Sequence, residues 1–146
     1  MERDRAFADL ALHAALRKAS LERRDRALAT ELAYGTLRLR GRVDYVLQHV
    51  LDRDLEKLDL PLRNLLRLGA YQILFCDSIR DAAAVSESVG LAKGSGLDRA
   101  HGLVNAVLRQ IGRVAEEIRF PKLEEDPVHH LMHWGSLPRW IAERWL

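Results

Sequence analysis

The chain has 146 residues, 48% of them hydrophobic and 30% charged, with only four prolines, which is typical of one folded domain and excludes a disordered or low-complexity segment. The net charge is only +2, so a site for an anionic partner has to come from an uneven distribution of charge. The start MERDRAF is not a signal peptide, no stretch is long and apolar enough to cross a bilayer, and the single cysteine cannot form an internal disulfide, so we expect a cytoplasmic protein with no membrane partner.

Two helices are predicted at the start of the chain. Apolar residues recur at spacings of three and four over Asp4–Lys18 and again over Arg24–Leu39. Gly41 follows the second helix at the position where a glycine commonly ends a helix in the left-handed conformation. We therefore expect Gly41 to separate this helix from the next.

The second helix lies in a basic segment. Between Arg17 and Arg42 there are eight basic and three acidic residues, whereas the stretch from Asp44 to Asp59 has more acids than bases. Basic side chains at a helix C-terminus interact favourably with the helix dipole and are often only solvated charge. A junction at Gly41, however, would let three guanidinium groups fan out around one point, and guanidinium groups suit phosphate. The predicted phosphate contacts are Arg38, Arg40 and Arg42, with Arg23 and Arg24 as weaker candidates.

Four further helices follow. A short third helix is expected from Arg42 to Leu51. The fourth has Asp59 at its N-cap and Pro61 in its first turn, and its apolar stripe up to Cys76 marks it as the central helix, with Cys76 a buried, inert thiol. Asp81 is expected to cap a fifth helix that ends at Lys93, and Asp98 a sixth. Short turns between six helices predict an all-α bundle.

The composition changes after Arg119. This stretch contains three prolines and a run of acids, and all three tryptophans lie in the last twenty residues. This pattern predicts an extended linker and then a short amphipathic helix in LPRWIAERWL. We expect residues 1–119 to form the bundle and residues 120–146 to connect it to a further part of a longer protein.

Several segments in order carry a family resemblance. ERRDRALATELAYGTLRLRGRVDYVL, LRLGAYQILF, AAVSESVGLAK and HGLVNAVLRQI resemble the NusB-like N-terminal domain of the Sun/RsmB (Fmu) family of bacterial rRNA cytosine-5 methyltransferases. The tail SLPRWIAERW is similar to that family's connector to its methyltransferase domain. The resemblance implies a NusB-like helical fold, binding of rRNA, and a downstream catalytic domain that uses S-adenosylmethionine.

The chain departs from that family in places. An additional N-terminal helix usually precedes the segment that begins here near Ala6. Ser86 stands where the family commonly has asparagine, Gly90 where it commonly has an acid, and His101 where it usually has lysine. The chain contains neither a glycine-rich cofactor turn nor a Pro-Cys nucleophile, so we expect no cofactor and no catalysis in this chain alone.

The remaining candidates lie in the fifth and sixth helices. Lys93 opens a KGSG turn that either caps a helix or holds a phosphate through its backbone N–H groups. Arg109 and His101 are second-rank RNA contacts, and Asn105 is expected to hydrogen-bond a neighbouring helix end. A zinc site at His129 and His133 is disfavoured because no third ligand is near in the sequence.

Three readings of the function remain open at this stage. The favoured one is an RNA-binding domain that positions rRNA for the downstream methyltransferase domain. The alternatives are a protein-interaction module of NusB type, with a ribosomal protein as partner, and a folding scaffold for the catalytic domain. If the first helix of the family is missing, the bundle is left with an exposed apolar groove. We expect this groove to be covered by the helix of Asp4–Lys18, by the tail, or by a second copy of the chain in a homodimer.

Overall fold

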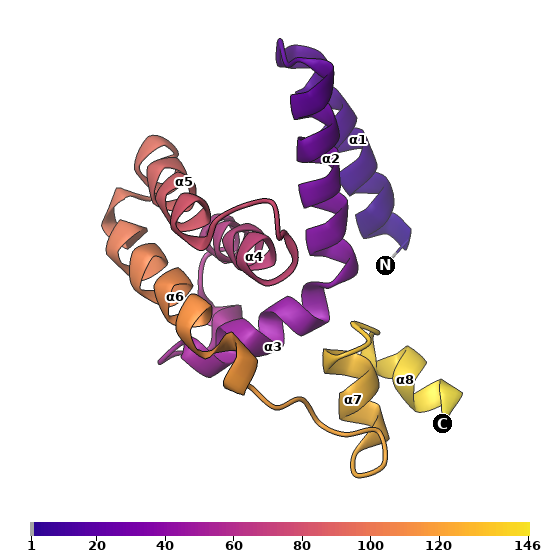
Figure 1. Cartoon of the computed structure of the whole chain (residues 1–146). Helices are drawn as coiled ribbons and strands as arrows, with labels where there is room; N and C mark the ends of the chain where they lie inside the picture. Colours follow the sequence, from indigo (N-terminus) through magenta and orange to yellow (C-terminus); the bar gives the residue numbers. More distant parts are fainter. Residues whose placement is uncertain (1) are drawn as a thin grey trace. The chain divides into compact units, whose positions relative to one another are not determined.

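The computed structural model describes residues 2–146, and the side chains of residues 10–146. Over this range the structure contains helices and no strand, which confirms the all-α fold class. The α-helices are α1 Glu2–Lys18, α2 Arg23–Arg38, α3 Arg40–Val50, α4 Leu60–Phe75, α5 Asp81–Gly94, α6 His101–Val114, α7 Pro127–His133 and α8 Arg139–Trp145 (Figure 1). None of the helices described is both long and apolar enough to span a membrane.

The chain divides into two compact units, residues 1–35 and 36–146. The first unit contains α1 and most of α2, joined by a short turn. Arg26 supports this turn, because its Nη2 donates a hydrogen bond of 2.6 Å to the carbonyl oxygen of Leu16. Both helices were predicted, with ends within two residues of those observed.

In the second unit α4 packs against α3, α5 and α6, as its long apolar stripe predicted (Figure 1). Leu66 and Ala70 of α4 are fully buried, as is Leu108 of α6. A Cβ on Gly69 would lie 2.6 Å from Leu108 Cδ1 and 2.8 Å from the hydroxyl oxygen of Ser88. The glycine therefore lets three helices approach closely. The core of the unit includes Val43, Val46, Leu47, Leu62, Leu66, Ala70, Ala84, Ala92, Val104, Val107, Leu108 and Ile111.

One buried ion pair joins α3 to α4. Arg67 is only 5% exposed, and its Nε and Nη2 donate to the two carboxylate oxygens of Asp44 at 2.7 and 2.9 Å. Its Nη1 donates to the side-chain oxygen of Asn64 at 3.2 Å. At least one acid of the segment from Asp44 to Asp59 therefore has a structural role, since Asp44 neutralises the buried guanidinium of Arg67.

Several helix ends differ from prediction. Asp81 is the first residue of α5 and not its N-cap, and Asp98 begins a short 3-10 turn before α6. The KGSG turn is a helix C-cap: Gly96 has a φ of 78°, and the N–H of Leu97 donates to the carbonyl of Ala92 at 3.0 Å. Cys76 is buried at the end of α4, as expected.

Gly41 does not end α2. It is the second residue of α3, it does not have a positive φ, and a Cβ there would lie 2.4 Å from the carbonyl oxygen of Met132 and 2.8 Å from the Cα of Ser136. The prediction of a left-handed cap was therefore wrong. Gly41 instead makes room for the end of α7 against α3.

The tail contains a helix, α7, that the linker prediction missed. Asp126 caps it by accepting a hydrogen bond from the His129 N–H, and α7 packs on α3. Tyr45 of α3 meets the rings of Phe120 and His133 at centroid distances of 4.8 and 4.6 Å. The tail thus packs on α3 through α7, and α8 packs on α7, whereas the homodimer remains a prediction.

Candidate nucleic-acid interface

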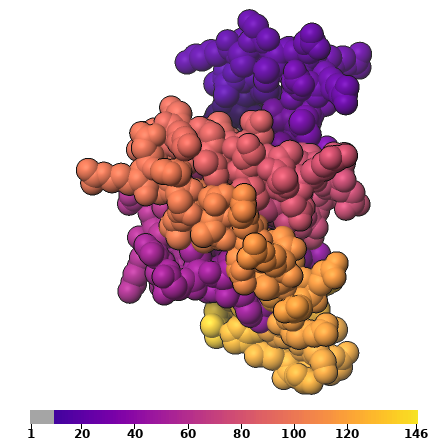
Figure 2. Space-filling model, turned by 60° about the vertical axis from the view of Figure 1, so that its left-hand side comes forward, coloured from indigo at the N-terminus to yellow at the C-terminus, as the bar shows by residue number. Residues whose placement is uncertain are grey.

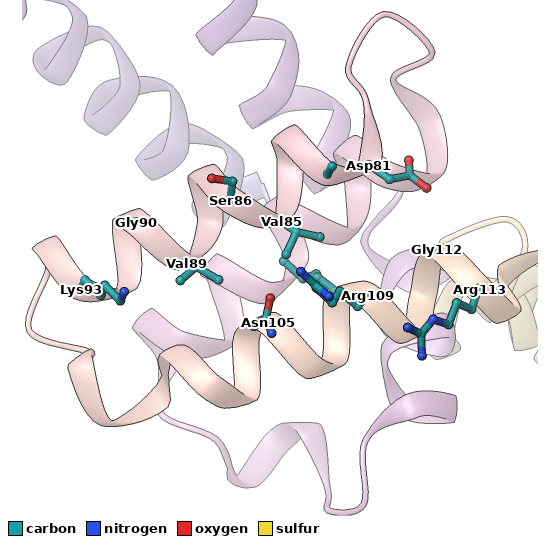
Figure 3. A pocket seen from close by; sticks show the side chains of 12 residues that line it. Asp81, Val85, Ser86, Val89, Gly90, Lys93, Asn105, Arg109, Gly112 and Arg113 are labelled. Atoms are coloured by element: carbon teal, nitrogen blue, oxygen red, sulfur yellow. The ribbon is translucent and has the colours of Figure 1, made fainter.

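A groove with a volume of about 720 Å³ runs between α5 and α6 (Figure 3). The two helices are antiparallel, because a short turn joins them and because a Cβ on Gly112 of α6 would lie 3.1 Å from a carboxylate oxygen of Asp81 of α5. Figure 2 shows both helices, in salmon and orange, side by side on an open face of the molecule. The lining residues are Asp81, Ala82, Val85, Ser86, Val89, Gly90, Lys93, Asn105, Leu108, Arg109, Gly112 and Arg113.

Three cations line this groove. Lys93 lies at one end, Arg113 at the other, and Arg109 between them (Figure 3). All three are exposed, and among the described side chains none lies close enough to any of them to form a hydrogen bond or an ion pair. Asp81 is the one acid among the lining residues. With three cations and one acid among its lining residues, the groove carries a net positive charge, which favours an anionic ligand.

Between the cations the groove has an apolar floor. Val85 and Leu108 are buried, and Figure 3 shows Val85 and Val89 pointing from α5 toward α6. Asn105 points the opposite way, from α6 toward α5 (Figure 3). Its half-buried amide makes no hydrogen bond with any residue the structure describes, so the expected bond to a neighbouring helix end was wrong. The floor thus combines apolar surface with an amide that is available to a ligand.

The predicted cluster at the junction of α2 and α3 is only partly assembled. Arg38 and Arg40 are exposed, with Arg40 3.7 Å from a carboxylate oxygen of Asp44. Arg42 is half-buried, and its Nε and Nη2 donate to the carbonyl oxygen of Trp134 at 2.9 and 2.7 Å. Burial lowers the pKa of Arg42, although an arginine remains charged at neutral pH. Arg42 thus binds the tail, and the phosphate contacts of Arg38, Arg40 and Arg42 stay a prediction.

Arg23 and Arg24 belong to the first unit, in the first turn of α2, and both are exposed. The helix dipole disfavours cations at this end, so the dipole does not explain their presence. His101 begins α6, where its Nδ1 donates to the carbonyl oxygen of Asp98, and it does not line the groove. The predicted contacts are thus spread over both units.

The tail histidines are held by protein groups. His129 Nδ1 lies 2.7 Å from a carboxylate oxygen of Asp126, and His130 Nδ1 lies 2.7 Å from the carbonyl oxygen of Pro121. The rings of His129 and His133 stack at a centroid distance of 5.8 Å. Within the described part of the chain, no three metal-binding side chains come together.

Comparison with known proteins identifies the fold family. A profile of the NusB family matches residues 1–113. The chain belongs to the NusB family. The resemblance seen in the sequence is therefore confirmed, and the groove lies between two helices of a NusB domain.

The relatives of this NusB domain are longer proteins. It is 34% identical over 145 residues to the probable ribosomal RNA small subunit methyltransferase B of Bacillus subtilis, which covers 99% of this chain and 32% of the relative. A putative methyltransferase of Mycobacterium tuberculosis is 41% identical over 143 residues, or 94% of this chain and 31% of the relative. Ribosomal RNA small subunit methyltransferase B of Pseudomonas putida is 37% identical over 123 residues, or 84% and 27%. The chain thus spans about a third of the length of the curated relatives it matches.

Sequence reasoning found two of the groove's cations and missed the third. Arg113 follows Arg109 by four residues, so the helical period places both on one face of α6. That signal was present in the sequence. The partner of Arg42 was not foreseeable, because Trp134 is 92 residues away in the chain.

Proposed function

We propose that this NusB domain binds the phosphate backbone of small-subunit rRNA and positions it for a cytosine-C5 methyltransferase domain of the parent protein. The methyltransferase domain would bind S-adenosylmethionine and catalyse the reaction. It would be a partner of this chain besides the rRNA, and we expect both in the cytoplasm. The observation that carries the proposal is the set of three exposed cations, Lys93, Arg109 and Arg113, along the groove between α5 and α6. Contacts of this kind place a nucleic acid without reading its sequence.

The names of the relatives support the choice of ligand. Those from Bacillus subtilis and Pseudomonas putida are named as methyltransferases of small-subunit ribosomal RNA. A domain of such an enzyme that exposes cations in a groove suits a polyanion better than a neutral protein surface. Exposed Arg38 and Arg40 are further candidate contacts with phosphate, as are Arg23, Arg24 and His101 more weakly.

The proposal is tested by titrating the 146-residue chain with fluorescein-labelled small-subunit rRNA fragments at several salt concentrations. If three phosphates of an unpaired strand are neutralised, log affinity should fall with log salt at a slope of roughly −2. The combined substitutions Lys93→Gln, Arg109→Gln and Arg113→Gln should remove most of that slope.

The matched control replaces three exposed cations of the tail, Lys122, Arg139 and Arg144, by glutamine. Both triple variants lower the net charge equally, so a specific groove predicts a loss of binding in the first and little change in the second. An equal loss in both would indicate a general charge effect, and no loss in either would overturn the proposal. A groove that serves a protein partner instead would leave the RNA affinity of both variants unchanged.

A further inference from the structure

We infer that the groove between α5 and α6 takes an unpaired nucleotide of the bound RNA, with its base on the apolar floor and its flanking phosphates on the cations. This inference rests on the proposed function and adds to it the structural class of the RNA, a single-stranded segment. The first observation behind it is the pairing of two kinds of surface in one groove. A floor containing Val85 and Leu108 lies between the ends marked by Lys93 and Arg113.

The size of the groove suits such a ligand. At about 720 Å³ it falls within the range of about 300–1,000 Å³ that is usual for pockets holding small organic ligands. A duplex presents its phosphates outward and keeps its base faces stacked inside, so it would contact the cations and leave the apolar floor uncovered. An unpaired nucleotide covers the floor with its base while its phosphates reach the rim.

The polar groups of the groove suit a base edge. The amide of Asn105 offers both a donor and an acceptor, and it is half-buried without a hydrogen bond to any described residue. Ser86, an exposed residue of the facing helix, also lines the groove and carries a hydroxyl group. No aromatic residue is among the lining residues, so the base would rest on the aliphatic side chains of the floor, such as Val85 and Val89.

Gly90 keeps one wall of the groove low. It lies within α5, lines the groove, is exposed, and has no atom within 4 Å of the position of a Cβ. Glycine inside a helix is unfavourable relative to almost any other residue, so this position is not chosen for helix stability. A side chain here would occupy the space that we assign to the base.

The decisive variant is therefore Gly90→Leu in the 146-residue chain. Leucine is a better helix former than glycine, so the melting temperature should stay the same or rise. Affinity for a labelled ten-nucleotide single strand of mixed sequence should fall at least fivefold, while affinity for the same strand paired with its complement should not change. Gly102→Leu is the matched control: Gly102 is also helical, exposed and uncrowded, but it lies outside the groove.

A second probe examines the base itself. The same strand with abasic sites keeps its phosphates and loses its bases, so it should bind to the unsubstituted chain at least fivefold more weakly. Equal affinity for abasic and intact strands, or a Gly90→Leu variant that binds the single strand normally, would overturn the inference. If either of these two results appears while the triple glutamine variant still loses RNA binding, the inference fails and the proposed function stands. If no RNA binds at all, the proposed function fails.

Discussion

The guanidinium group of Arg42 lies on the ring of Trp134, with its central carbon 3.9 Å from the ring centroid. The same group donates two hydrogen bonds to the Trp134 carbonyl oxygen, and the Arg42 N–H donates to the Ser136 hydroxyl oxygen at 3.1 Å. One residue at the start of α3 therefore binds the tail through its side chain and its backbone. Arg42 is a structural contact of the domain, whatever else it touches.

Replacing Arg42 by alanine should loosen the tail. Hydrogen bonds to a charged group contribute about 1.5–3 kcal/mol, and a cation–π contact about 0.5–1 kcal/mol. Because such contributions do not add fully, we expect the free energy of unfolding to fall by about 2 kcal/mol in urea denaturation. Limited proteolysis should also become faster between Phe120 and Asp126.

Arg40→Ala is the control for this variant. Arg40 is exposed and reaches only a neighbouring carboxylate on its own helix, a kind of pair that contributes about 0.3–0.5 kcal/mol. An Arg42→Ala variant as stable as Arg40→Ala would mean that the tail is not held by this contact.

Gly41→Ala should be destabilising although alanine favours a helix by about 1 kcal/mol over glycine. The new Cβ would meet the backbone of Met132 and Ser136, which belong to α7 and the turn after it, so the tail would have to move. Overpacking of this kind typically costs about 1–3 kcal/mol. Thermal melts of both variants are the measurement. A Cβ at Gly102 would meet no atom within 4 Å, so Gly102→Ala should be neutral or stabilising. Equal effects of the two variants would argue against close docking of the tail.

The sequence allowed the bundle to be predicted because its helices follow local rules. Apolar periodicity located α4 and α6, and their ends were placed within a few residues. The errors arose where a residue far along the chain decides local structure. Gly41 was predicted to be a helix cap because the sequence does not show that the Met132 carbonyl of the tail approaches this position closely. The linker prediction missed α7 for a related reason, since a seven-residue helix is too short to show a clear period and is held by packing on α3.

Two of the residues of the candidate site could be predicted from the sequence, but their assembly into one groove could not. Lys93 and Arg109 were selected singly, and only the antiparallel packing of α5 on α6 brings them to one groove with Arg113. Arg42 was selected for the same chemistry, yet the structure uses its charge to hold a carbonyl oxygen. Sequence patterns indicate which side chains can bind phosphate, whereas tertiary contacts determine which of them are free to do so.

Removing the carboxylate of Asp44 should lower the free energy of unfolding more than removing an exposed carboxylate. Asp44→Ala leaves the buried guanidinium of Arg67 without its bidentate partner, and breaking a buried pair from one side costs about 3–5 kcal/mol. We expect a loss of about 3 kcal/mol in urea denaturation, since Glu56 lies 4.0 Å from Arg67 as a partial substitute. The control is Asp52→Ala, which removes an exposed pair with Arg53 and should lower the free energy of unfolding far less. Similar losses in the two variants would contradict a structural role for the buried pair.

Acidification should weaken the docking of the tail on α3 through His133. Burial, above all, lowers the pKa of His133, and His129 and His49 lower it further, while Asp126 raises it. Tyr45 is the neighbour from α3 whose ring packs on it. Because the pKa of His133 is lower in the folded state, the unfolded chain binds more protons, so this contribution to stability is complete above about pH 6.5 and declines as the pH falls below it.

The measurement compares melting temperatures at neutral pH and about one to two units below the ordinary histidine pKa of roughly 6.5. The wild-type protein should lose more stability on acidification than His133→Phe, which keeps a ring against Tyr45 and cannot be protonated. His101→Gln removes a histidine that lies outside the aromatic cluster and should follow the wild type. Asp126, whose pKa is lowered chiefly by the hydrogen bond from the His129 N–H, loses its contribution only at much lower pH and does not interfere. If His133→Phe were as acid-sensitive as the wild type, protonation of His133 would not be what loosens the tail.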